Sequence, residues 1–343
     1  MKWLMNRTAR KRAWAAVLAL GLVAAVSGCG GGSDGGSGDL TKVTVTTNWV
    51  PSAQHAPLYV ALNQGLFKKH GLDVKVEPGK GSLDAALKVG AGSAQFALID
   101  TTAALVAIGK GAEVVNVAAY MKKYPGGICF NERKVKINSL EDFKGATLGT
   151  VENDAFTLGL KSLLKRNGID AASAIKEVIT DAATQQSALL AGRVDMIPCS
   201  TQSKMGAIRG GKAAGVDVGF FSLADHGLDA VGFSLVVARS VIDKDEKTVA
   251  GFVAAFTEAT QLTIDDPKAA VAGLKANVPD VTERTELDLL VDEVIPCIIK
   301  DEATRYTFTD DDIAATVRNA EDSFGVTLSD PSRYFTNKYV EVH

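Results

Sequence analysis

Polar side chains and one tryptophan follow four short apolar segments of the sequence, and these positions could bind a small molecule. They are Asn48, Trp49 and His55, then Asp100 and Thr101, then Thr150, Glu152 and Asn153, and finally Ser200. A tryptophan offers a flat face for stacking, while amides, hydroxyls and carboxylates hydrogen-bond the polar edge of a bound molecule. Because Trp49 lies in a turn with little core to fill, we expect it to stack on a planar ligand.

Several of these side chains also have a structural interpretation. Trp49 could pack between two lobes of the chain, and His55 lies near a helix start, where a histidine can cap or support the turn. Asp100 and Asn153 each precede an expected helix, where such residues cap the first turn. Tyr120 follows a further apolar segment, and its ring could close over a ligand or pack against a hinge. The residues alone leave these alternatives open.

The sequence contains no motif of a nucleophile elbow, a phosphate-binding loop, a zinc helix or a dinucleotide site. Gly90 and Gly92 follow an expected helix, which is the wrong place for a dinucleotide turn. The 343 residues include 37 basic and 40 acidic side chains with no basic stripe, so nucleic acid is not an expected partner. We therefore expect no catalytic residue, no cofactor and no metal.

Expected strands and helices alternate along the chain. The strands are 43–46, 72–76, 96–99, 114–118, 147–151, 175–179, 196–197 and 231–238. The helices are 58–67, 84–90, 102–109, 155–167, 184–191 and 247–264, with a capped turn at 139–143 and helical character beyond 264. Such alternation predicts an α/β fold in which helices flank mostly parallel sheets.

The order of these segments predicts two lobes joined by two hinge crossings. Lobe 1 comprises residues 41–125 and 231–343, and lobe 2 comprises residues 126–230. Ligands of open α/β sheets bind beyond the carboxyl ends of the strands, and hinged lobes often enclose them. The residues that follow the strands should therefore meet between the lobes.

The N-terminal residues predict export. Basic residues precede an uncharged segment, 13–28, that is too short to span a bilayer, so residues 1–28 are typical of a signal peptide. The residues Val26-Ser27-Gly28-Cys29 resemble a bacterial lipobox, which predicts lipidation of Cys29 and a flexible linker over residues 29–40. Ordinary secretory cleavage with an incidental cysteine is the alternative.

Cys129, Cys199 and Cys297 then remain, and none belongs to a C-x-x-C pair. An odd number leaves at least one free thiol, and a disulfide is allowed outside the cytoplasm. A bond between Cys129 and Cys199 stays open, although buried unpaired cysteines are the interpretation that we favour here.

The segment after the first strand resembles the opening of the thiamine-pyrimidine family. The matching residues are Asn48-Trp49, 55–61, 65–67 and 71–74, with further similarity at 127–130, 145–151 and 192–195, so that residues 42–240 are covered. The family includes importer binding proteins for pyrimidine thiamine precursors, fungal pyrimidine synthases that use pyridoxal phosphate, and binders of riboflavin, taurine, sulfonates or nitrate. The resemblance implies a two-lobed periplasmic-binding fold in which Asn48, Trp49 and residues 150–152 line a cleft.

The resemblance also shows departures from the fungal enzymes. Ile99 and Ala103 stand where those enzymes have a lysine and a histidine, and residues 226–233 replace a cysteine-rich run. We therefore expect a binding protein and not an enzyme: a monomeric lipoprotein on the outer face of a bacterial membrane. It would pass a planar heteroaromatic nutrient, such as a pyrimidine thiamine precursor or a flavin-like molecule, to an ABC permease and its ATPase. A sulfonate, taurine or nitrate carrier and a pyrimidine synthase are the alternatives.

Overall fold

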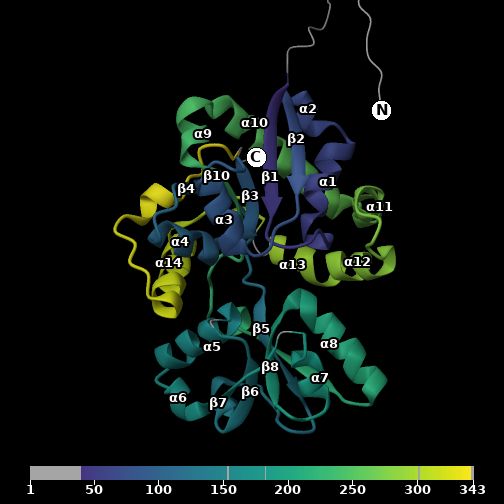
Figure 1. The fold of residues 1–343 in the computed structure, drawn as a ribbon, viewed down its shortest axis with the longest axis vertical. Coiled ribbons are helices and arrows are strands. Elements are labelled where there is room, and N and C mark those ends of the chain that lie inside the picture. Colours follow the sequence, from purple (N-terminus) through teal and green to yellow (C-terminus); the bar gives the residue numbers. More distant parts are fainter. Residues whose placement is uncertain (1–39, 153, 182, 300–301, 341–343) are drawn as a thin grey trace, which may run out of the picture. The chain divides into compact units, whose positions relative to one another are not determined.

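Two five-stranded sheets organise the chain (Figure 1). The computed structural model describes residues 40–340 except 153, 182, 300 and 301. Sheet A has the order β2-β1-β3-β10-β4, with β1 (Thr41–Thr47), β2 (Leu72–Glu77), β3 (Phe96–Asp100), β10 (Phe233–Ala238) and β4 (Val114–Met121). Sheet B has the order β7-β6-β8-β5-β9, with β7 (Ile175–Ile179), β6 (Ala146–Thr150), β8 (Met196–Ser200), β5 (Gly126–Asn131) and β9 (Val218–Ser222).

Each sheet contains one reversed strand, which is the strand that follows a crossing between the sheets. The strand β10 runs antiparallel to both of its neighbours, as does β5, and the remaining pairs are parallel. The chain passes from β4 to β5 through residues 122–125 and returns from β9 to β10 through residues 223–232. The expected α/β fold with two mostly parallel sheets and two crossings is confirmed.

Helices cover both faces of sheet A. Helices α1 (Ala56–Asn63) and α10 (Glu246–Asp265) pack on one face, and α3 (Ser82–Gly90), α4 (Thr101–Gly109) and α14 (Asp310–Phe324) pack on the other. The strand β3 contributes side chains to both faces of sheet A. Phe96 and Leu98 belong to the hydrophobic cluster on one face, and Ala97 and Ile99 belong to the cluster on the other. Burial on both faces explains why β3 is a continuous apolar run.

Sheet B is covered in the same way. Helices α5 (Ala155–Arg166) and α6 (Ala171–Ala174) pack on one face, and α7 (Gln185–Leu190) and α8 (Thr201–Ala214) pack on the other. The second face also buries Cys129 and Cys199, which are joined in a disulfide with a Cα separation of 5.5 Å. Our preference for unpaired cysteines was wrong for this pair, while Cys297 is free and buried.

The expected elements are largely present, with three kinds of difference. The first helix is two helices, since Gly65 adopts a left-handed conformation (φ 69°) between α1 and α2 (Leu66–Lys69). The strand β8 continues to Ser200, beyond the expected residues 196–197. The elements β5, α8 and β9 were not expected at all.

The C-terminal third is helical, as expected from its sequence. It contains α9 (Arg239–Lys244), α11 (Pro267–Asn277), α12 (Glu283–Leu289), a turn of π-helix at Leu290–Val294 labelled η4, and α13 (Ile295–Ile298). None of the helices within the described part of the chain is long and apolar enough to cross a membrane.

Three predictions lie outside the described residues. They are the signal peptide of residues 1–28, the lipidation of Cys29 and nearly all of the linker over residues 29–40. The predicted site residue Asn153 lies outside them as well.

Candidate functional site

Trp49 lies in the turn that follows β1, and 56% of its surface is exposed. The Thr47 hydroxyl shapes this turn, because it donates to the Trp49 carbonyl oxygen at 2.5 Å and accepts from the Gly79 N–H at 3.2 Å. A Cβ atom at Gly79 would lie 1.8 Å from the Thr47 carbonyl oxygen, so only glycine allows this approach. The turn is thus held by the Thr47 hydroxyl and the close approach of Gly79, and the indole remains exposed.

Asn48 forms a hydrogen-bond network with the next turn of the chain. Its Oδ1 accepts from Gln54 Nε2 at 2.9 Å and lies 2.8 Å from His55 Nε2. His55 is fully buried, and this burial lowers its pKa to about 3. The imidazole is therefore neutral, and it reaches the site through Asn48.

Asp100 and Thr101 lie where β3 meets α4. Asp100 caps this helix, because its Oδ1 accepts from the Ala103 N–H at 2.7 Å, and burial raises its pKa to about 7. Thr101 is fully buried, and its hydroxyl has no hydrogen-bond partner among the described residues. The capping interpretation of Asp100 is confirmed, and ligand contact by these two residues stays a prediction.

Tyr120 is fully buried beneath the network. Its hydroxyl donates to the Gln54 carbonyl oxygen at 2.8 Å, and its ring meets the edge of Phe256 at a centroid distance of 5.3 Å. The structure therefore places Tyr120 in the core, as a support for Gln54, instead of at the surface of a site.

In sheet B, the end of β6 carries the next predicted positions. Thr150 is buried, and its hydroxyl shares a hydrogen bond of 2.8 Å with that of Thr157. Glu152 is exposed in the following loop. Asp154 caps α5 by accepting from the Thr157 N–H at 2.8 Å, and burial raises the pKa of Asp154.

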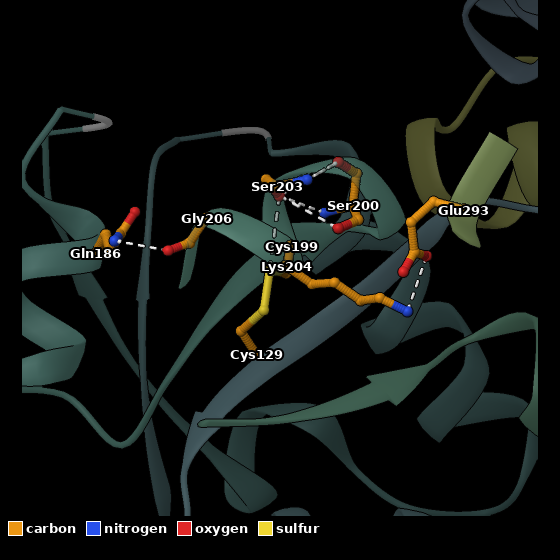
Figure 2. Close-up of a disulfide and its surroundings, with 8 residues drawn as sticks. All are labelled: Cys129, Gln186, Cys199, Ser200, Ser203, Lys204, Gly206 and Glu293. Atoms are coloured by element: carbon orange, nitrogen blue, oxygen red, sulfur yellow. Dashed lines mark hydrogen bonds and ion pairs between the residues drawn. A yellow bond between two sulfur atoms is a disulfide. The ribbon is translucent and has the colours of Figure 1, made fainter. Parts of the chain in front are cut away.

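Ser200 is the N-cap of α8, a helix that was not expected from the sequence. Its hydroxyl accepts from the Ser203 N–H at 3.0 Å, and the Ser203 hydroxyl accepts from the Ser200 N–H at 2.8 Å (Figure 2). Ser200 directly follows Cys199, so the disulfide to β5 anchors the strand from which α8 starts. This capping box defines the first turn of α8.

Two side chains of α8 contact residues of the lobe that contains sheet A. Gln202 Nε2 donates to Gln54 Oε1. Lys204 Nζ lies 2.8 Å from Glu293 Oε2 (Figure 2). Lys204 also lies 4.8 Å from the centroid of the Phe220 ring. Gln54 and Glu293 of one lobe thus meet Gln202 and Lys204 of the other, and these four residues form a junction that sequence spacing alone could not show.

Glu293 lies in the π-helical turn η4, and 8% of its side chain is exposed. Burial raises its pKa, while Lys204 lowers it. Glu286, one element earlier, accepts from the Ala53 N–H at 2.6 Å and also has a pKa that burial raises. The described residues contain no cluster of three or more His, Cys, Asp and Glu side chains that could hold a metal.

A family model described as NMT1/THI5 like matches residues 52–270, which is more than half of the chain. The chain belongs to the NMT1/THI5-like family. Among curated relatives of this family member, a formylaminopyrimidine-binding protein of Halalkalibacterium halodurans is 24% identical over 74% of the chain and 77% of the relative. The riboflavin-binding protein RibY of Chloroflexus aurantiacus is 25% identical over 67% of the chain and 65% of the relative.

Saccharomyces cerevisiae 4-amino-5-hydroxymethyl-2-methylpyrimidine phosphate synthases are 26% identical to this NMT1/THI5-like chain over 110 residues, and it spans about a third of their length. Among solved structures, the aliphatic sulphonate binding protein SsuA of Escherichia coli has a TM-score of 0.64 at 17% identity, covering 83% of this chain and 86% of that one. This likeness shows the fold, which is the two-lobed periplasmic-binding type.

Proposed function

We propose that this protein captures a small planar heteroaromatic nutrient between its lobes and delivers it to an ABC importer. The observation that carries the proposal is the exposed indole of Trp49 beside Asn48, at the carboxyl end of β1, where α/β proteins bind ligands. The curated binding proteins match two thirds to three quarters of the chain, whereas the synthases match a third. This difference in coverage supports binding over catalysis.

An exported, monomeric lipoprotein attached through Cys29 would stay at the outer face of the membrane, within reach of a permease and its ATPase. The lobe assignment of residues 41–125 with 231–343 and of residues 126–230 follows the two crossings of the chain. A ligand that contacts both lobes would shift their equilibrium toward the form in which they meet, which the permease could recognise.

An anionic solute such as a sulfonate or nitrate is the less favoured ligand. Arg133 and Arg193 are both exposed, and they flank the Phe130–Met196 pairing at the amino end of β8. Ser200 lies at the opposite end of this strand. The two arginines therefore lie at the end of β8 opposite to Ser200 and the junction, and they offer no charge for an anion bound at the junction.

A pyrimidine synthase is also disfavoured by the structure. Ile99, at the position of the enzymes' lysine, is fully buried in sheet A, and Ala103 supplies a backbone N–H to the Asp100 cap. Neither side chain offers a group for the chemistry that the resemblance assigns to those positions.

A ligand screen by thermal unfolding tests the proposal. The panel contains 4-amino-5-hydroxymethyl-2-methylpyrimidine, formylaminopyrimidine, riboflavin, taurine and nitrate. A pyrimidine or flavin at 100 times its dissociation constant should stabilise the protein by about 2.7 kcal/mol. Stabilisation by taurine or nitrate alone would contradict the proposed solute class.

A further inference from the structure

The hydrogen bonds around His55 define its tautomer. The Ser52 N–H donates to His55 Nδ1 at 3.1 Å, and a backbone N–H can only donate. The atom Nδ1 therefore carries no proton. Because the imidazole is fully buried and neutral, its single proton must be on Nε2.

The Nε2 proton in turn defines the orientation of the Asn48 amide. His55 Nε2 lies 2.8 Å from an atom of that amide, which must be the acceptor, Oδ1. This network begins at the Ser52 N–H, which can only donate, so the orientation of the Asn48 amide follows from it. The Gln54 group at 2.9 Å from the same oxygen must then be its Nε2. Gln54 Oε1 is left to accept from Gln202, on the other lobe.

Asn48 is the member of this network that can contact a ligand. Its Oδ1 already accepts two hydrogen bonds, and its Nδ2 has no partner within the part of the chain that the structure describes. Asn48 is half-buried and directly precedes the exposed Trp49. The free donor is thus adjacent in sequence to the stacking surface.

We propose that His55 and Gln54 are positioning residues that fix Asn48 as a hydrogen-bond donor to the solute. The solute must then present an acceptor, such as an unprotonated ring nitrogen or a carbonyl oxygen, at the edge of the ring that stacks on Trp49. This inference rests on the proposed function and specifies its ligand class. Gln202 bonds Gln54, and so joins the network, only when the lobes meet. Contact between the lobes and the donor orientation of Asn48 therefore stabilise each other.

The tautomer can be measured on the full chain without any ligand. Nitrogen-15 NMR of the labelled protein should show His55 as the neutral Nε2–H form from mildly acidic to neutral pH. An Nδ1–H form, or a protonated ring at neutral pH, would overturn the proposal. This readout does not depend on the identity of the solute.

A matched ligand pair tests the donor itself by calorimetry. The probes are 4-amino-5-hydroxymethyl-2-methylpyrimidine and its benzene analogue, in which both ring nitrogens are C–H. The wild type should prefer the pyrimidine by about tenfold or more, since the analogue leaves the donor unpaired. Asn48→Asp keeps an oxygen for His55 and Gln54 but removes the donor, so it should abolish the preference.

The same ligand pair separates positioning from simple structural support. His55→Gln retains a donor for Asn48 and should keep most of the preference, whereas His55→Phe should lose it. If the His55 variants do not fold, Asn48→Asp decides the question, and an unchanged preference in that variant overturns the proposal. If neither probe binds the wild type and no pyrimidine or flavin of the thermal screen stabilises it, the proposed function fails, while the NMR measurement still decides the orientation of Asn48.

Discussion

At the scale of single residues, the predicted site residues include exposed and fully buried side chains. Trp49 is exposed, whereas His55, Thr101 and Tyr120 are fully buried. Hydrogen bonds of the Thr47 hydroxyl hold the turn that carries Trp49, while the His55 ring bonds Asn48 and the Tyr120 hydroxyl bonds Gln54. We therefore expect direct ligand contact from Trp49 and Asn48 and support from His55 and Tyr120, while ligand contact by Thr101 stays a prediction.

Replacement of Trp49 should weaken solute binding. Trp49→Ala removes the stacking surface and should cost about 1 to 3 kcal/mol of binding free energy, or about 5-fold to 150-fold in affinity. The measurement is calorimetric titration with the pyrimidine or flavin that the thermal screen selects. Val50→Ala, which trims the adjacent and equally exposed side chain, is the matched control and should bind normally. Equal affinities for the two variants would remove Trp49 from the site.

The carboxyl group of Asp100 should make stability fall as the pH rises. Its pKa is raised from 3.8 to about 7 in the folded protein, so the folded state binds more protons than the unfolded state between these values. The stabilisation is fully present below pH 3.8 and is lost as the pH rises through about 7. Each pKa unit corresponds to about 1.4 kcal/mol.

Asp100→Asn tests this pH dependence, because asparagine caps a helix about as well as aspartate. Relative to the wild type, the variant should gain stability with rising pH up to about 7 and keep a constant difference above it. Urea unfolding at a series of pH values gives the difference directly. A difference that does not change with pH would show that the carboxyl group is not perturbed.

At the scale of elements, α8 is the helix that connects sheet B to the junction. The capping box of Ser200 and Ser203 starts it, and its first two turns carry Gln202 and Lys204. The strand before it is tied to β5 by the Cys129–Cys199 disulfide. The position of α8 therefore depends on both a cap and a covalent bond.

Removal of the disulfide should destabilise the protein. The bond closes a sequence separation of 70 residues, and Cys129→Ala with Cys199→Ala should lower the free energy of unfolding by about 2 to 5 kcal/mol. Urea unfolding of the double variant measures this loss. Urea unfolding in the presence of the reductant dithiothreitol is the matched control. The reductant should lower the unfolding midpoint of wild-type protein whose disulfide has been reduced, and it should leave the midpoint of the double variant unchanged. Equal stability of variant and wild type would contradict the prediction.

At the scale of the whole molecule, two sheets are joined by residues 122–125 and 223–232 and by side-chain contacts across the junction. The Lys204–Glu293 pair is mostly buried, with exposed side-chain fractions of 22% and 8%. Burial makes the loss of one partner costly, because the remaining charge is left without compensation. The pair should therefore favour the form in which the lobes meet.

Neutralising the lysine should shift the protein toward an open form. Lys204→Met leaves Glu293 unpaired and should weaken ligand affinity by about 1 to 3 kcal/mol. Small-angle scattering of the ligand-free variant should show a larger radius of gyration, and calorimetry should show the weaker binding. Lys69→Met removes an exposed pair with Glu258 within the sheet A lobe and should change neither quantity. An unaltered radius and affinity in Lys204→Met would exclude a role in closure.

The sequence by itself determined the fold class and the turn after β1, because these depend on local patterns. Alternating apolar segments predicted the sheets, and the polar residues after Thr47 predicted a turn that exposes Trp49. The tertiary structure alone decided the partners across the chain. Gln54 meets Gln202 and Cys129 meets Cys199 because β5 and α8 lie where they do, and neither element has a clear periodicity. Hydrophobic patterns report which face of an element is buried, whereas long-range polar contacts depend on how the elements pack.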